Sequence, residues 1–486
     1  MQGDFSRVTF DPARHFSAVL AQQGRVQLDA DINEQTAILL HHLRTLAADI
    51  FGPAAYPAPA DGRSPGGFAV SFTHDTLAVK AGRMYVDGIL CECLDGTDYW
   101  SQPDGHLDPT RDTGKALPKD NFLVYLRVWE RLVTAADVPA IREVALGPHS
   151  PDTTARTRVV WQVDWMPLTT DFFHDHPELG ADPGRFLQDR LAERTGPRPR
   201  LEASAREPQD ETDTGGLPPG PGYQGPENQL YRVEIHRGGP AGTATFKWSR
   251  ENASVALPIR SVQGSVVEVE SLGRDSSLGL VTGDMVEIVD DATICRTADD
   301  ITPDDEPGED TAPGRTRLYC VTDIDYSARH VYLDTAPAPV PQWPDAGTNP
   351  ALHPVLRRWD HRPPGPQTPD QQTLDGTGTI PVQEGTWLLL EDGIVVRFSP
   401  EDPAKPCRYR SGDYWLIPAR VVTGDVEWPA DPQGNPLPRE PHGVDYHYAP
   451  LAVIKAAEAD DAPGTRKAPD LRTPFPQPRP LRPDHA

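Results

Sequence analysis

The chain has 486 residues, of which 37% are hydrophobic and 7% aromatic, enough for several packed cores. Its 54 prolines and 40 glycines argue against a mainly helical protein and favour short strands and turns. Because 72 acidic residues face 46 lysines and arginines, the net charge is -26, which argues against binding to nucleic acid or to an anionic membrane.

The cysteine content and the first residues bear on where the chain is made. Five cysteines without the density of a disulfide-stabilised scaffold predict free, mostly buried thiols and a reducing compartment. Residues 1–20 contain no basic start followed by an apolar core, and no stretch approaches about 18 apolar residues. We therefore expect synthesis in the cytoplasm without a signal peptide, and no membrane insertion. The cysteines are Cys91, Cys93, Cys295, Cys320 and Cys407.

The N-terminal residues have the character of a docking arm. Chain termini are usually frayed and tolerant of change, yet this one begins MQGDFSRVTFDPARHFSAVLAQQGRVQLDADINEQ. Phe5, Phe10 and Phe16 precede a Gln-Gln-Gly turn. Large apolar groups on an arm too short to form its own core are typical interface anchors. The alternative, that the arm folds back over the β-rich part of its own chain, stays open.

One long helix is predicted, over Asp29–Ile50. Asp31 and Glu34 have the spacing of a capping box, and a Gly-Pro pair follows the helix. Apolar residues recur at alternating spacings of four and three, the a/d pattern of a helix packed lengthwise on another helix. An amphipathic helix lying on its own domain is the other interpretation, and both stay open. The pattern comprises Ile32, Thr36, Leu39, Leu43, Leu46 and Ile50.

The remaining sequence predicts short antiparallel strands between turn-rich stretches. About five strands between residues 260 and 335 favour a small barrel of the SH3 or OB type. The expected fold class is α+β, mainly β and multidomain, with one long N-terminal helix. The predicted parts are an arm and helix for attachment or oligomerisation (1–53), a β-rich domain with long loops (54–226), a β domain containing the barrel (227–350), a C-terminal β segment (351–456) and a flexible Pro-rich tail (457–486).

The sequence contains no nucleophile elbow, phosphate loop, dinucleotide fingerprint or HExxH zinc motif. His174-Asp175-His176 offers two metal ligands, but a solvated turn is the favoured interpretation of this Pro-flanked loop. We expect no metal, no cofactor and no enzyme activity.

Two acidic pairs are weak candidates for glycoside hydrolysis. Glu391-Asp392 and Asp425/Glu427 are carboxylate pairs, but sequence spacing does not establish the separation that this chemistry needs. A late cluster of aromatic residues either stacks on sugars or fills a core, and core packing is favoured. The cluster comprises Tyr414, Trp415, Trp428, Tyr446 and Tyr448.

The opening residues resemble those of a bacterial family whose members begin MxGDFSR and continue with QQGRVQLDADxNEQ. That family is found with phage-tail-like contractile injection systems. The later blocks FKWSRENASV, GDMVEIVDD, EDGIVVRF, SGDYWLIPAR and GDVEWP also look like its pieces. A more distant similarity links GRMYVDG and the start of the helix to attachment domains of phage tail fibres.

The resemblance implies a non-enzymatic structural subunit of an injection particle, with an attachment, adaptor, plug or baseplate role. It also implies a particle assembled in the bacterial cytoplasm and released by lysis. Two alternatives stay open. A cargo or effector packed in the particle would show activity or toxicity when freed, and a carbohydrate-binding module would show glycan affinity that depends on the late aromatic residues.

We expect docking through the arm and the helix, to other particle subunits (tube, spike, baseplate or fibre) or between copies of this chain. Three-fold tail symmetry favours a trimer, although the seam composition does not fix the number of copies. Arginines in an acidic chain suit carboxylates on a partner. The residues predicted to bind a partner are Phe5, Arg7, Phe10, Arg14, Phe16, Arg25, Leu39, Leu43 and Leu46.

Overall fold

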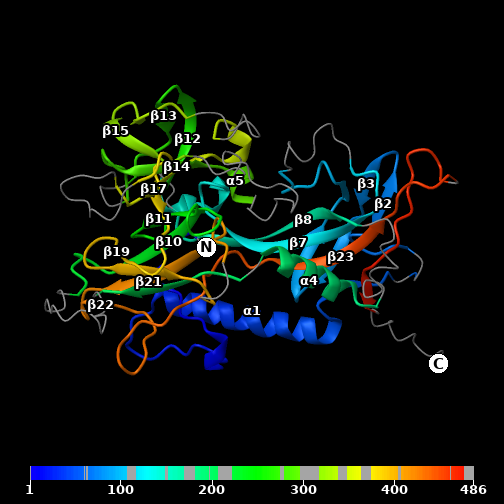
Figure 1. Ribbon diagram of the computed structural model, residues 1–486, viewed down its shortest axis with the longest axis horizontal. Helices are drawn as coiled ribbons and strands as arrows, with labels where there is room; N and C mark the ends of the chain where they lie inside the picture. The colour runs from blue at the N-terminus through cyan, green and yellow to red at the C-terminus, as the bar shows by residue number, and fades with distance from the viewer. Residues whose placement is uncertain are drawn as a thin grey trace. The chain divides into compact units, whose positions relative to one another are not determined.

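The fold is mainly β, with one long helix, as expected from the sequence (Figure 1). The computed structural model describes residues 2–59, 61, 64–106, 117–147, 152–168, 181–195, 197–205, 222–273, 278–295, 317–337, 347–362, 374–402, 407–459 and 461–475. The chain divides into two compact units, each built from three separate segments. Unit 1 comprises Met1–Val8, Leu132–Arg156 and Arg194–Val444, and unit 2 comprises Thr9–Arg131, Thr157–Glu193 and Asp445–Ala486.

The helices of the described residues are few. The predicted long helix is confirmed as α1, and it is the longest of them. None is both long and apolar enough to cross a membrane. The helices are α1 (Asp29–Phe51), α4 (Pro183–Thr195) and α5 (Asp291–Cys295), with short 3-10 turns η1 (Pro12–Arg14), η3 (Pro139–Ile141), η4 (Val144–Leu146) and η6 (Pro350–Leu352).

Unit 2 contains three sheets around one apolar core. Their strand orders are β24-β1-β4-β5, β2-β3-β6 and β23-β7-β8. Residues from all three sheets, among them Phe72, Met84 and Val124, are buried in this core. The strands are β1 (Ala54–Pro57), β2 (Val70–Thr73), β3 (Thr76–Val79), β4 (Gly82–Val86), β5 (Ile89–Cys93), β6 (Thr97–Asp98), β7 (Phe122–Val133), β8 (Arg156–Pro167), β23 (His447–Ile454) and β24 (Thr473–Phe475).

Unit 1 contains two packed sheets and a closed barrel. The sheets have the orders β18-β11-β10-β21-β22 and β19-β20-β9, and their inner faces share a core that includes Tyr231, Trp248 and Phe398. The strands of the sheets are β9 (Arg200–Ser204), β10 (Gln229–Arg237), β11 (Thr245–Ser249), β18 (Ile380–Pro381), β19 (Trp387–Leu389), β20 (Val395–Ser399), β21 (Tyr414–Arg420) and β22 (Asp425–Val426).

The small barrel predicted in the middle of the chain is present and closed, with the order β12-β13-β16-β15-β14-β17. Its first strand begins at Ala256, just before the predicted limit of 260, and its last strand, Val355–Trp359, lies beyond the predicted limit of 335. The barrel strands are β12 (Ala256–Gln263), β13 (Val266–Val269), β14 (Met285–Val289), β15 (Tyr319–Asp325), β16 (His330–Leu333) and β17 (Val355–Trp359).

All five cysteines are free, as the sequence predicts, and four of them are buried. Burial raises the pKa of the Cys91 thiol to about 12 and that of Cys407 to about 11. Because the thiolate is the reactive form of cysteine, these two side chains serve packing rather than chemistry.

The predicted flexible tail is folded over its first part, which corrects that expectation for residues 461–475. Strand β24 pairs in parallel with β1, and Phe475 stacks on Phe51 with ring centroids 4.2 Å apart. The guanidinium of Arg466 lies over the rings of Phe72 and Phe122 and donates to the carbonyl oxygens of Lys455, Pro118 and Asp120. Polar side chains hold this Pro-rich segment where apolar ones are scarce.

Replacing Arg466 by Met tests whether this segment stabilises unit 2. The substitution keeps an apolar stem but leaves three carbonyl groups without their donor, so we expect a loss of about 2–4 kcal/mol in the free energy of unfolding. The neighbouring Lys467 is exposed, and Lys467→Met should change stability by less than about 0.5 kcal/mol. Urea unfolding of both variants measures the difference, and equal midpoints would show that the tail contributes nothing.

Candidate functional site

Helix α1 begins and ends with identifiable caps. The backbone N–H of Leu28 donates to Oδ2 of Asp31 at 3.3 Å, so Leu28 occupies the N-cap position. The predicted pairing of Asp31 with Glu34 is wrong, because Glu34 instead accepts from Oγ1 of Thr9 at 2.6 Å. At the other end Gly52 adopts a φ of 87°, which favours glycine, and its N–H bonds to the carbonyl of Ala48.

One side of α1 is covered by unit 2. Successive residues turn by about 100°, which places Ala30, Ala37, Arg44 and Ala48 on this side. Ala30 is 1% exposed, and the other three are half-buried. Arg44 forms a bidentate ion pair with Glu130, with N–O distances of 2.9 and 2.7 Å. Ile38 of the helix is also only 1% exposed. Small residues, one isoleucine and one arginine therefore make up the covered part of α1.

The predicted a/d residues form an exposed stripe on the opposite side of the helix. We call Ile32, Thr36, Leu39, Leu43, Leu46 and Ile50 the α1 stripe. The exposed fraction of its apolar members is 61% for Ile32, 53% for Leu39, 62% for Leu43, 57% for Leu46 and 63% for Ile50. The helix thus turns its most apolar side away from the residues that cover it. This is the reverse of the usual amphipathic arrangement.

The arm between residues 9 and 28 also carries exposed apolar side chains. Its described contacts are few: Val19 donates its N–H to Gln35 at 2.7 Å, and Phe10 lies against His41 with ring centroids 5.7 Å apart. Four other apolar side chains remain exposed, with fractions of 53% for Phe16, 82% for Leu20, 83% for Val26 and 44% for Leu28. A monomer rarely leaves so many apolar groups together in water.

Residues 2–8, in contrast, are docked within unit 1. Gln2 donates to Glu234 at 3.1 Å, and Nδ2 of Asn252 donates to the carbonyl of Gly3 at 2.9 Å. Gly3 is buried, and a Cβ there would lie 2.7 Å from the Phe5 ring. Arg7 pairs with Glu427 at 3.2 Å. The fold-back interpretation therefore holds for residues 2–8, whereas residues 9–28 are exposed apart from Thr9, Phe10 and Val19, and their docking to a partner stays a prediction.

The nine predicted partner-binding residues fall into two groups. Phe5, Arg7 and Phe10 are half-buried and already make the contacts described above. The other six are exposed, and their role in binding stays a prediction. They are Arg14, Phe16, Arg25, Leu39, Leu43 and Leu46.

Sequence reasoning missed a buried network of charges in unit 1. Lys247 is 1% exposed, lies 2.5 Å from Glu287 and 3.6 Å from Glu234, and stacks over the Trp359 ring. Arg232 also pairs with Glu234, at 2.6 Å. The block FKWSREN contains Lys247 and most of strand β11. Its apolar and polar residues alternate because they lie on opposite faces of β11, and both faces are buried. Such a pattern is typical of a central strand whose polar side chains are paired.

The next residues of the same block hold a carboxyl group with an altered pKa. Burial raises the pKa of Glu251 to about 7, although Arg358, 3.2 Å away, opposes the change. The nearby charge of Asp360 raises it further, and Asp4 of the N-terminal segment adds to the same effect. Glu251 therefore titrates near neutral pH beside the docked residues 2–8.

In each of the two acidic pairs considered for hydrolysis, the glutamate is paired with an arginine. Glu391 accepts from Arg250 at 2.9 and 2.7 Å and from the Tyr231 hydroxyl at 2.9 Å. Burial would raise the pKa of Glu427, but hydrogen bonds and charge from Arg420, with Arg7, lower it below its usual value. Glu391 and Glu427 therefore have structural partners in unit 1.

The late aromatic residues pack rather than form a platform. Tyr414 and Trp415 are buried, and the other three are half-buried. Tyr446 lies 5.4 Å from Trp129 between ring centroids. The favoured interpretation of core packing agrees with these positions.

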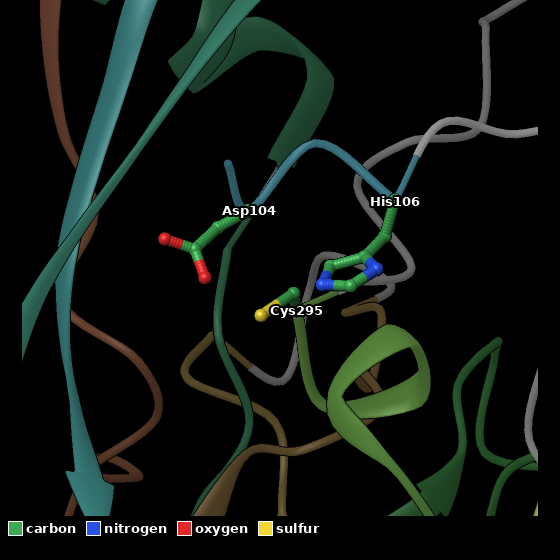
Figure 2. A group of neighbouring side chains, drawn as sticks. All are labelled: Asp104, His106 and Cys295. Carbon is green, nitrogen blue, oxygen red and sulfur yellow. The ribbon is translucent and has the colours of Figure 1, made fainter. Parts of the chain in front are cut away.

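Among the residues that the structure describes, candidate metal ligands do not assemble into one site within a unit. Figure 2 shows the side chains of Asp104, His106 and Cys295. Asp104 and His106 belong to unit 2 and Cys295 to unit 1, so we assign no metal to this trio. The predicted pair in His174-Asp175-His176 lies outside the described residues.

Comparison with known proteins gives a family without a function. The family described as "Family of unknown function (DUF6519)" matches residues 1–170 and 175–463. No curated protein and no solved structure matches the chain.

The raised pKa of Glu251 predicts a pH dependence of stability. Ionising Glu251 costs more in the folded chain than in the unfolded one, so stability should fall as pH rises from about 4.5 to about 7. Glu251→Gln removes this titration, and its loss of stability over the same window should be smaller by about 2 kcal/mol. Urea unfolding at a series of pH values measures both slopes. A wild-type slope in Glu251→Gln would contradict the assignment.

Proposed function

We propose a function for this chain, which belongs to the family of unknown function DUF6519, from its own residues. It is a non-enzymatic structural subunit of a phage-tail-like contractile injection system, with an attachment or adaptor role. The resemblance of its N-terminal residues to proteins of such systems supplies the kind of particle. The exposed arm and the α1 stripe supply the means of attachment.

The observation that carries the proposal is the orientation of helix α1. Five apolar side chains with the spacing of a helix–helix seam are more than half exposed, while the covered part of the helix carries mainly small residues together with Ile38 and Arg44. Leaving them in water gives up a large hydrophobic contribution, roughly 1.5–3 kcal/mol for each such side chain when fully buried. A chain that presents them in this order is built for a contact that forms on assembly.

The described carboxylates support a structural rather than a chemical role. Glu391 and Glu427 hold Arg250 and Arg420, and Lys247 lies between Glu234 and Glu287. These pairs hold segments of unit 1 to each other, which agrees with a structural subunit. Buried pairs of this kind also specify one arrangement of strands.

Nothing in the described residues favours cargo or carbohydrate binding over this role. Sugar-binding platforms present exposed aromatic faces, whereas Tyr414 and Trp415 are buried. A subunit made in the bacterial cytoplasm and released within a particle fits the proposal, and it stays an expectation.

The proposal predicts that the arm is needed for incorporation into particles. Phe16→Ser, Leu20→Ser and Val26→Ser together remove three exposed apolar groups, so the content of this chain in purified particles should fall at least about tenfold. The melting temperature of the isolated chain should change by less than about 2 °C, because these groups contact water. Quantitative mass spectrometry of particles from the native host measures incorporation.

A matched control removes equally exposed apolar groups elsewhere. Val144→Ser, Leu146→Ser and Val422→Ser change side chains in unit 1, far along the sequence from the arm, and should leave incorporation unchanged. If the arm variant is present at the wild-type level, the arm does not attach the chain. If the wild-type chain never sediments with particles that contain sheath and tube proteins, the particle assignment itself is wrong.

A further inference from the structure

We propose that the α1 stripe binds the α1 stripe of a second copy of this chain. The inference rests on the proposed docking role of α1, but it does not depend on the identity of the particle. It follows from the spacing of the stripe, from the charges beside it and from the charge of the whole chain.

The spacing makes the stripe complementary to itself. In heptad terms, Thr36, Leu43 and Ile50 occupy a positions, and Ile32, Leu39 and Leu46 occupy d positions. Two such seams pack knobs into holes without any further sequence requirement, because each apolar layer of one helix meets an apolar layer of the other. At about 1.5 Å per residue the stripe spans roughly 27 Å, or five helical turns.

The flanking residues do not specify a different partner. In coiled coils the e and g positions usually select the partner by complementary charges. Here a single ionised residue, Asp49, stands among them. The flanking positions are Asn33, Leu40 and Ala47 on one side and Gln35, His42 and Asp49 on the other. Copies of this helix therefore meet across a nearly neutral strip.

Neutrality matters because the chain carries a net charge of -26. Two copies repel each other at long range, and this repulsion is screened beyond about 8 Å in physiological salt. A contact between copies is favourable only where the facing surfaces lack acidic groups, and the α1 stripe is such a surface. The exposed Arg14 and Arg25 of the arm extend it with positive charge, which suits the acidic surface of another copy.

Sedimentation of the full chain over a range of concentrations tests the proposal. At tens of micromolar the wild-type chain should sediment as an assembly of at least two copies of the 53.3 kDa chain. Leu43→Lys with Leu46→Lys places charges in the seam and should raise the dissociation constant at least about 100-fold. Both leucines are exposed, so the melting temperature of the dissociated chain should not fall.

The control carries the same added charge away from the stripe. Thr45 is exposed on α1 but points away from the seam, and Val422 is 96% exposed in unit 1. Thr45→Lys with Val422→Lys should sediment like the wild type. Both variants reduce the net negative charge by the same amount. A difference in their sedimentation is therefore caused by the charges in the seam and not by the change in net charge.

Two results would overturn the proposal. One is a wild-type chain that sediments as a single copy at every concentration, and the other is association that persists in Leu43→Lys with Leu46→Lys. A single-copy chain that is still incorporated into particles through its arm would overturn self-association alone and leave the proposed function standing.

Discussion

The covered side of helix α1 is held to unit 2 by a bidentate ion pair, in which both carboxylate oxygens of Glu130 accept from the Arg44 guanidinium at 2.9 and 2.7 Å, and the helix also buries Ala30 and Ile38. The helix also approaches the turn after β4 closely: a Cβ on Gly88 would lie 2.1 Å from the carbonyl oxygen of Arg44. With φ at 76°, Gly88 has two reasons to be glycine. Once Arg44 is fixed, helical geometry leaves the α1 stripe in solvent.

The N-terminal residues have two roles that the chain separates at residue 8. Residues 2–8 complete the polar network of unit 1, where Asn252 donates to the carbonyl of Gly3 and Gln2 donates to Glu234. Residues 9–28 keep Phe16, Leu20, Val26 and Leu28 exposed. The sequence of residues 2–8 is therefore constrained by contacts within the chain. The exposed apolar groups of residues 9–28 are the ones we propose for contact with a partner. Buried charges such as Lys247 and Glu234 favour one arrangement of this region over others.

Sequence patterns predicted those elements whose formation depends on neighbouring residues in the chain. The α1 helix follows from the period of its apolar residues. Contacts between distant segments were not predictable in this way. Strand β7 lies between β23 and β8, and β23 is more than 300 residues later in the chain. The exposure of the α1 stripe could not be predicted either, because an a/d pattern does not tell whether that side of the helix packs against its own chain or faces away from it.

The central claim is that protein covers the α1 stripe when the chain is in its assembled state. Hydroxyl-radical footprinting with mass spectrometry compares side-chain oxidation in the dilute, dissociated chain and in the assembled state. The account predicts that oxidation of Leu43 and Leu46 falls severalfold on assembly, while the exposed Leu94 and Val144 are oxidised equally in both states. Equal oxidation of Leu43 and Leu46 in the two states would contradict the account.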